Sequence, residues 1–121
     1  MNRQQLFDLV RTQYSVEPDY PWDDDNAVLR HFPGKKWFGV ILNVRLSQLG
    51  LNGDQQIDIL NVKCDPLLIG SFRQKQGIHP AWHMNKSSWL SIRLDGSAAD
   101  EDIQFLLERS WELTEERKKG R

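Results

Sequence analysis

The sequence is poor in the residues from which disulfides, membrane spans and secretion signals are built. Its single cysteine, Cys64, excludes an internal disulfide and is compatible with a reducing compartment. No apolar run approaches the ~20 residues that a membrane-spanning helix needs. Residues 1–10 lack the basic and then apolar pattern of a signal peptide. We therefore predict a cytoplasmic protein with no membrane partner.

Patterns for catalysis and for cofactor binding are also missing. The sequence contains no glycine-rich phosphate loop and no nucleophile elbow. His79 and His83 have a spacing that could hold a metal ion on a helix, but Pro80 between them disrupts a helix there and no third ligand lies nearby. Cys64 is the last residue of an expected strand, where a buried thiol is the more common case. We predict neither an enzyme nor a metal or cofactor site.

Charge is present in quantity but is unevenly distributed, although the net charge is only −1. Residues 1–29 carry two basic and six acidic side chains. Residues 30–93 carry nine basic and three acidic side chains, and residues 94–121 carry five basic and eight acidic ones. The three segments therefore have charges of −4, +6 and −3. A basic segment of this kind can attract a polyanion even in a nearly neutral molecule. The alternative is that the acidic segments fold against it and cancel its field.

Apolar spacing and capping residues predict three helices. The first is capped by Asn2, with Gln5 three residues later, and ends near Tyr14. The second begins at Asp65-Pro66, because aspartate accepts bonds from the free amides of a first turn and proline is preset for the first helical position. It ends at Gly77. The third is long and is capped by Ser97, with Asp100 at the capping-box position.

Aromatic and β-branched runs predict strands over residues 27–32, 37–45, 56–64 and 89–94, with a short strand and a turn between 78 and 86. Only one connection between successive strands is helical. The sheet should therefore be mainly antiparallel, with helices packed on one face, in a single α+β domain covering residues 1–121.

Alternation along the strands predicts what the other face of this sheet displays to solvent. We assign to it Trp37, Asn43, Arg45, Asn61, Lys63, Trp89, Ser91 and Arg93, and we place Phe38, Val40, Leu42 and Val44 on the helix side. Cations suit phosphates and flat side chains suit bases, so such a face favours nucleic acid. Lys35 and Lys36 in the preceding turn could reach a neighbouring backbone. The alternative is a solvated face whose tryptophans cover a small secondary cluster.

A polar cluster at an expected turn, His83, Asn85 and Lys86, is closed by Trp89. His83 and Lys86 could contact a phosphate or an acidic partner. A structural role is the alternative, with Asn85 capping the turn and His83 bonded to a backbone carbonyl.

Two strings of residues carry a resemblance to the bacterial MmcQ/YjbR family: Asn61-Val62-Lys63-Cys64-Asp65-Pro66 and His83-Met84-Asn85-Lys86-Ser87-Ser88-Trp89. The strand Lys36-Trp37-Phe38-Gly39-Val40-Ile41 and the late helix entered from Asp100-Glu101 also fit. The resemblance implies a compact α+β domain like that of the frataxin homologue CyaY. It also implies a DNA-binding protein whose sheet edges and hairpins embrace the duplex as a double wing. It brings no catalytic residue set.

These observations together predict a non-enzymatic module that binds nucleic acid, DNA in particular, weakly and with little sequence preference. Its contacts are expected from a basic sheet face and hairpin turns, through Lys35, Lys36, Arg45, Lys63, His83, Asn85, Lys86 and Arg93. A protein-interaction or adaptor domain is the alternative, suggested by the acidic N-terminal segment and an exposed aromatic face. A small-molecule enzyme with His83, Asn85 and Lys86 around a pocket is a third hypothesis.

Overall fold

A five-stranded antiparallel sheet forms one layer of the computed structural model, which describes residues 1–31 and 36–115. The strands are β1 (Ala27–Arg30), β2 (Trp37–Arg45), β3 (Gln56–Lys63), β4 (Ile78–Pro80) and β5 (Trp89–Arg93). Their order across the sheet is β1-β2-β3-β5-β4, and every neighbouring pair is antiparallel. The predicted α+β class and the mainly antiparallel sheet are confirmed.

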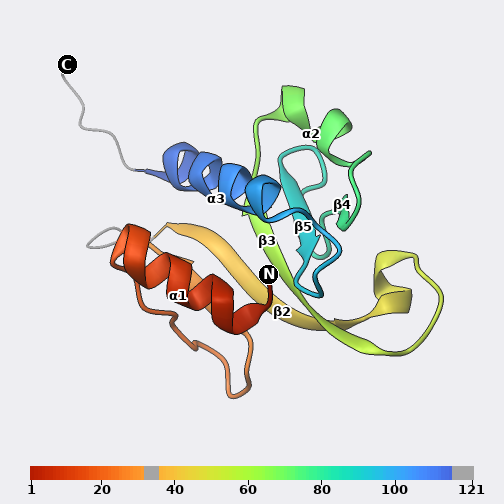
Figure 1. Ribbon diagram of the computed structural model, residues 1–121, viewed down its shortest axis with the longest axis horizontal. Coiled ribbons are helices and arrows are strands. Elements are labelled where there is room, and N and C mark those ends of the chain that lie inside the picture. Colours follow the sequence, from red (N-terminus) through yellow and green to blue (C-terminus); the bar gives the residue numbers. More distant parts are fainter. Residues whose placement is uncertain (32–35, 116–121) are drawn as a thin grey trace.

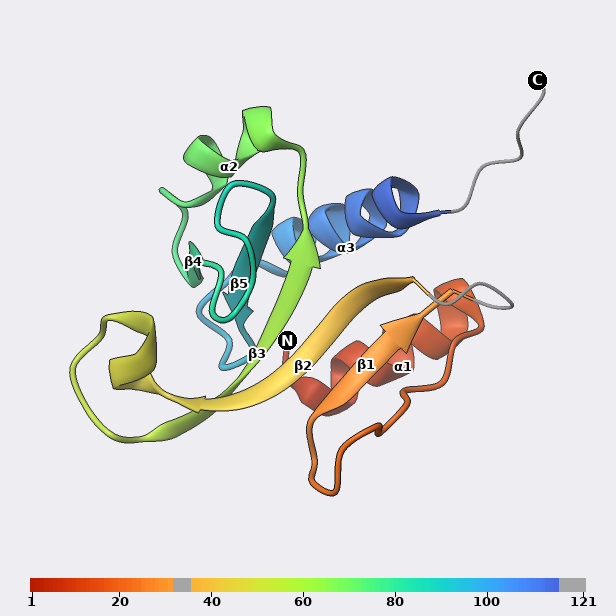
Figure 2. The same cartoon turned by 180° about the vertical axis from the view of Figure 1, so that it is seen from behind.

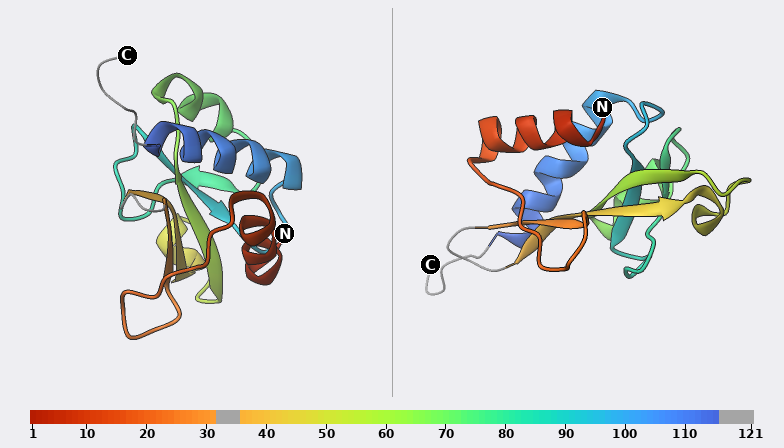
Figure 3. Two further views of the ribbon diagram at one scale, coloured as in Figure 1. Left: turned by 90° about the vertical axis from the view of Figure 1, so that its left-hand side faces the viewer. Right: turned by 90° about the horizontal axis from the view of Figure 1, so that it is seen from below.

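The helices are α1 (Arg3–Tyr14), α2 (Pro66–Phe72) and α3 (Asp100–Thr114), with a short 3-10 helix, η1 (Leu46–Leu49), in the connection from β2 to β3. Helices α1 and α3 lie on the same face of the sheet (Figures 1 and 3). Figure 2 shows the molecule from behind, with the sheet in front of both helices. α2 lies beyond the end of β3. No helix within the described ranges is both long and apolar enough to cross a bilayer.

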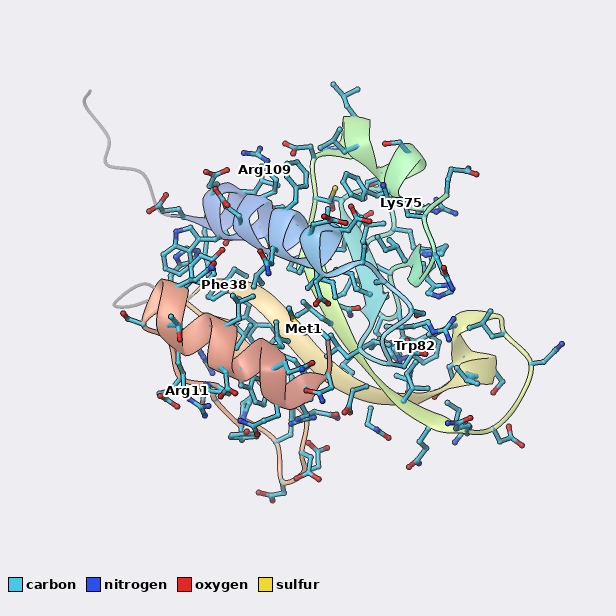
Figure 4. All side chains as sticks on the ribbon, viewed as in Figure 1. Met1, Arg11, Phe38, Lys75, Trp82 and Arg109 are labelled. Carbon is cyan, nitrogen blue, oxygen red and sulfur yellow. The ribbon has the colours of Figure 1, made fainter. Side chains whose placement is uncertain are left out.

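The hydrophobic core lies between the two long helices and the sheet. Ile41 pairs with Leu60 and Leu60 with Ile92, so these three side chains share one row on the helix side. α1 and α3 supply the opposite wall with fully buried side chains, namely Leu6, Val10, Ile103, Leu106 and Leu107. Phe38 lies between α1 and α3 (Figure 4) and is also fully buried.

The register corrects the predicted faces of β2. Val40 pairs with Asn61, whereas Arg45 pairs with Gln56. Opposed residues of an antiparallel pair lie on the same side of the sheet. Val40, with Leu42 and Val44, therefore shares the far face with Asn61, and Arg45 lies on the helix-side face, away from Lys63 and Arg93.

A β-bulge explains why the alternation predicted the wrong phase. The register between β1 and β2 shifts between Leu29 and Arg30, which face Gly39 and Trp37. The extra residue, Phe38, packs its ring 4.9 Å from that of Trp111 on α3. A bulge places two residues opposite one, so alternation counted from Phe38 fails for the rest of the strand.

The part of the far face that runs from Asn61 to the η1 end is sealed by the segment between β4 and β5, which corrects the expectation of an open face. The Asn61 side-chain amide donates to the Trp82 carbonyl (2.9 Å), and the Trp82 amide donates to Ser91 Oγ (2.8 Å). Asn61 and Ser91 are fully buried. The Trp82 ring packs against Val44, Ile57 and Ile59 together with side chains of η1 (Figure 4).

Two of the predicted helix caps are wrong, because the capping side chains have other partners. Asp65 Oδ2 and Oδ1 accept bonds from Arg109 Nε and Nη2 (3.0 and 2.8 Å) and do not cap α2, which ends at Phe72. A bidentate bond to a guanidinium is stronger than a bond to a neutral amide. Ser97 Oγ donates to Asp95 (2.5 Å), and α3 begins at Asp100 without a side-chain cap.

The start of α1 is as predicted. Asn2 Oδ1 accepts from the Gln5 amide (2.8 Å) while Gln5 Oε1 accepts from the Asn2 amide (2.9 Å), and Tyr14 is the last helical residue. Both partners of this capping box lie within one turn of each other, so the local sequence is sufficient to form it.

Candidate nucleic-acid interface

Two tryptophans and two lysines line one groove of about 380 Å³. Trp37 begins β2 and Lys36 precedes it, while Lys63 ends β3 and Trp89 begins β5. The last turn of α3 completes the wall with Leu113 and Thr114. The volume falls within the ~300–1,000 Å³ of small-ligand sites. Trp37, Lys63 and Trp89 were predicted on one face, and the structure brings them together with Lys36.

β2 and β3 separate beside α3, as Figure 2 shows, and the residues that line the groove lie at this separation. The β2–β3 ladder ends at Val40 and Asn61. Beyond it, the Lys63 amide donates to Ser110 Oγ (2.9 Å), and Ser110 Oγ donates to the Phe38 carbonyl (2.6 Å). Two successive hydrogen bonds through a buried hydroxyl of α3 thus replace one direct bond between strands. The strands stand further apart without leaving either backbone group unpaired.

On the other side of the groove, β3 and β5 remain paired. Lys63 lies directly opposite Trp89. The pairing continues past the strand ends, because the Cys64 amide donates to the Ser88 carbonyl (2.8 Å). The pairing of β3 with β5 therefore places the side chains of Lys63 and Trp89 next to each other on the same face of the sheet.

Trp37 is held by two further contacts. Its ring lies 5.9 Å from that of Trp22 in a nearly perpendicular arrangement. The Arg30 guanidinium lies 5.9 Å from the same ring and pairs with Asp19 at 2.6 Å. Trp22 was not among the predicted candidate residues. The available signal was a tryptophan that directly follows Pro21 and precedes three aspartates, and it is 41% exposed in the structure.

Thr114 also lines the groove, and its hydroxyl is already engaged. It donates to the Ser110 carbonyl (2.7 Å) and lies 2.8 Å from His31 Nε2. Burial lowers the pKa of His31, with smaller effects from Glu115, Trp111 and Lys36. The neutral imidazole is therefore favoured beside the groove.

Ion pairs neutralise part of the basic segment. Three of its cations pair with acids of the flanking segments, namely Arg30 with Asp19, Lys75 with Asp102 and Arg93 with Asp95. Over residues 1–31 and 36–115, Lys36 and Lys63 make no ion pair. The acidic segments thus cancel some of the positive charge, and none of the ion pairs between described residues involves Lys36 or Lys63.

The other predicted contacts lie elsewhere. Arg45 is exposed at the opposite end of β2, about 26 Å from Trp37 at ~3.3 Å per residue. Arg93 donates twice to Asp95, at 2.9 and 2.6 Å. Lys35 falls outside the described residues.

The cluster of His83, Asn85 and Lys86 lies on the segment that follows Trp82. Asn85 Oδ1 accepts from the Ser87 amide and hydroxyl (2.9 and 2.7 Å), so Asn85 caps the turn. The His83 ring lies 4.4 Å from the Trp82 ring. His83, Asn85 and Lys86 are all exposed.

A larger cavity, of about 790 Å³, lies between α1 and the loop before β1, and several of its lining groups bond within the chain. Arg3 lies 3.6 Å from Asp58 and donates to the Asp25 carbonyl. The Asn43 amide donates to Asn26 Oδ1 (2.9 Å). The lining also carries the carboxylates of Asp24, Asp25 and Asp58, which suit a polyanion less well than the two lysines of the groove.

Cys64 is buried, and burial raises the pKa of its thiol to about 11. The thiol form predominates near neutrality, which opposes a role as nucleophile. No group of three or more histidine, cysteine or carboxylate side chains in the described part of the chain is arranged to hold a metal ion.

With the fold and the groove in place, comparison with known proteins identifies the family. Residues 11–113 match the sequence model of the family YjbR. The chain belongs to the YjbR family. It is 41% identical to the uncharacterised protein YyaQ of Bacillus subtilis over 116 residues, which cover 94% of this chain and 98% of YyaQ. It is also 33% identical to the uncharacterised protein YjbR of Escherichia coli over 66 residues, 50% of this chain and 56% of that protein. The predicted family membership is confirmed.

Solved structures agree with this assignment. A crystal structure of a Pseudomonas syringae protein matches this YjbR-family chain with a TM-score of 0.91 and 40% identity, covering 95% of this chain and all of that one. The Deinococcus radiodurans protein DR2400 has a TM-score of 0.62 and 23% identity, covering 88% of this chain and 75% of that one, which shows a shared fold. These names carry no activity, so function has to be argued from the groove.

Proposed function

We propose that this YjbR-family protein is a non-enzymatic, cytoplasmic module that binds nucleic acid, including DNA. The observation that carries the proposal is the groove in which Lys36 and Lys63 lie with Trp37 and Trp89. Lysines contribute affinity for phosphates, and aromatic faces contribute stacking on bases. Both kinds of group converge there, and the two lysines make no ion pair within residues 1–31 and 36–115.

Binding should be weak and tolerant of sequence. Two phosphate contacts correspond to a slope of log affinity against log salt of about −1.8 for duplex DNA and about −1.4 for a single strand. Sequence discrimination needs side chains that form bidentate bonds with base edges. Asn85 is committed to its turn and Arg93 to Asp95, which is consistent with little base discrimination.

The test is fluorescence anisotropy of labelled oligonucleotides at two salt concentrations. Lys63→Gln should weaken binding and should reduce the magnitude of the salt slope by the amount that one phosphate contact contributes. Arg73→Gln is the matched control, because Arg73 is exposed at the end of α2 and does not line the groove, yet its loss changes the net charge equally. No binding by wild type at low salt, or equal loss in both variants, would reject a nucleic-acid site in the groove.

Arg45 tests the double-wing arrangement, in which the β2–β3 hairpin would embrace a duplex. Because Arg45 lies at the far end of β2, Arg45→Gln should leave binding in the groove unchanged. A loss equal to that of Lys63→Gln would instead assign the contact to the hairpin.

A protein partner is the second candidate, favoured by apolar side chains that are exposed on α2 and α3. Leu67 is 95% exposed and Phe105 46% exposed, and the Phe105 ring stacks on Phe72 at 5.6 Å. Exposed apolar patches mark interaction surfaces. A partner recovered after nuclease treatment by wild type but not by Leu67→Ser would support this function. Recovery of the partner by both wild type and Leu67→Ser would reject binding through Leu67.

A further inference from the structure

We infer that the groove accepts unpaired bases against Trp37 and Trp89, so that the preferred ligand is single-stranded nucleic acid rather than duplex. This inference rests on the proposed nucleic-acid function and names its ligand class. It depends on the shape of the groove, on the groups that line it and on the way its aromatic walls are fixed.

The shape of the groove favours a strand whose bases are turned outward. The groove is a recess between separating strands, with one tryptophan on each side of the opening. Bases within a duplex are stacked and paired, so an indole at the side of a recess cannot reach their faces. The major groove, in contrast, admits a protruding helix or β-ribbon. A recess lined by indoles therefore matches the exposed bases of a single strand.

The polar groups of the groove indicate that bases are bound by stacking and not identified by hydrogen bonds. The Thr114 hydroxyl is already bonded to the Ser110 carbonyl and lies against His31. The charged groups available to a ligand are the ammonium groups of Lys36 and Lys63. Ammonium groups suit phosphates, and stacking accepts any base, since every base has a π face.

The aromatic walls are fixed before a ligand arrives. The Trp37 ring is held by Trp22 and Arg30, and the strand register fixes the backbone of Trp89 opposite Lys63. The hydroxyl of Ser110 keeps β2 and β3 apart. Fixed walls reduce the entropy that is lost when a base is bound.

The experiment compares four probes with wild-type protein by anisotropy: oligothymidine, oligouridine, an abasic deoxyribose-phosphate strand of equal length, and the duplex of the oligothymidine. Oligothymidine or oligouridine should bind about 5- to 150-fold more tightly than the abasic strand, which corresponds to the ~1–3 kcal/mol per stacked base. The ratio of the two base-containing strands distinguishes DNA from RNA as the source of the bases. The duplex should bind no better than the abasic strand.

Variants separate this inference from the function on which it rests. Trp89→Ala should abolish the preference for bases, whereas Trp89→Phe should keep most of it. Phe105→Ala, an exposed aromatic on another surface, is the matched control and should change nothing. Thermal melting of each variant verifies the fold, and quenching of wild-type tryptophan fluorescence by oligothymidine but not by the abasic strand gives a readout that needs no variant.

Two outcomes overturn different claims. If all four probes bind equally and Lys63→Gln weakens them all, the proposed function stands and the inference about unpaired bases is wrong. If none of the probes binds at low salt, the proposed function itself fails.

Discussion

The far face of the sheet has two ends that each carry a tryptophan, and they differ in how their polar groups are satisfied. At one end Trp82 lies over Asn61 and Ser91, and every group named there bonds within the chain. At the other end Trp37 and Trp89 border a groove with two lysines that make no ion pair within the described ranges. Tryptophans on a sheet face are therefore not informative by themselves. The unpaired cations and the separated strands distinguish a candidate site from a secondary core.

The largest effect should follow from Ser110→Ala, at the groove end. The change removes the partner of the Lys63 amide and of the Phe38 carbonyl, both beside a fully buried hydroxyl. Two backbone groups without partners cost about 2–6 kcal/mol in the free energy of unfolding. Urea denaturation measures this loss. Ser47→Ala, at an exposed serine, should stay within ~0.5 kcal/mol and serves as the control.

Asn61→Ala, at the sealed end, should have the next largest effect and should act on stability alone. It leaves the Trp82 carbonyl without its buried donor and should cost about 1–3 kcal/mol by urea denaturation. Oligonucleotide affinity at a temperature where the variant is folded should equal that of wild type. A lowered affinity would remove the distinction between the two ends.

The smallest effect should come from pH. Because burial lowers the pKa of His31 below 6.5, the unfolded chain takes up a proton at a higher pH than the folded one. Stability from this group is present above pH 6.5 and is lost as pH falls through the lowered value. The free energy of unfolding should be lower at pH 5.5 than at pH 7.5, and this difference should be smaller in His31→Gln. The difference that remains in the variant is expected from His79, whose pKa is also lowered by burial. An equal difference in wild type and His31→Gln would contradict this account.

Local signals were sufficient for much of the fold. The capping box of Asn2 and Gln5, the strand over residues 37–45 and the order of helices and strands all depend on neighbours in the sequence. The caps expected from Asp65 and Ser97 failed because a stronger partner was available. For Asp65 that partner is Arg109, 44 residues away, which no local pattern indicates.

The candidate site was predictable where strand pairing was regular. Lys63 and Trp89 were assigned to one face, and they are direct partners on β3 and β5. Arg45 was assigned to the same face in error, because the bulge at Phe38 depends on how β1 pairs with β2. The role of Ser110 could not be inferred either, since a serine within an apolar helical stripe does not reveal which backbone groups it bridges.

Cys64 adds a practical consequence, because it directly follows Lys63 and its amide is bonded to Ser88 at the end of the β3–β5 pairing. Its thiol is buried, and its pKa of about 11 makes it slow to react in the closed state. A thiol-reactive dye therefore reaches it only when the structure opens locally at this end. The rate of labelling therefore reports how often this end opens in the wild-type protein. A ligand bound in the groove should lower that rate.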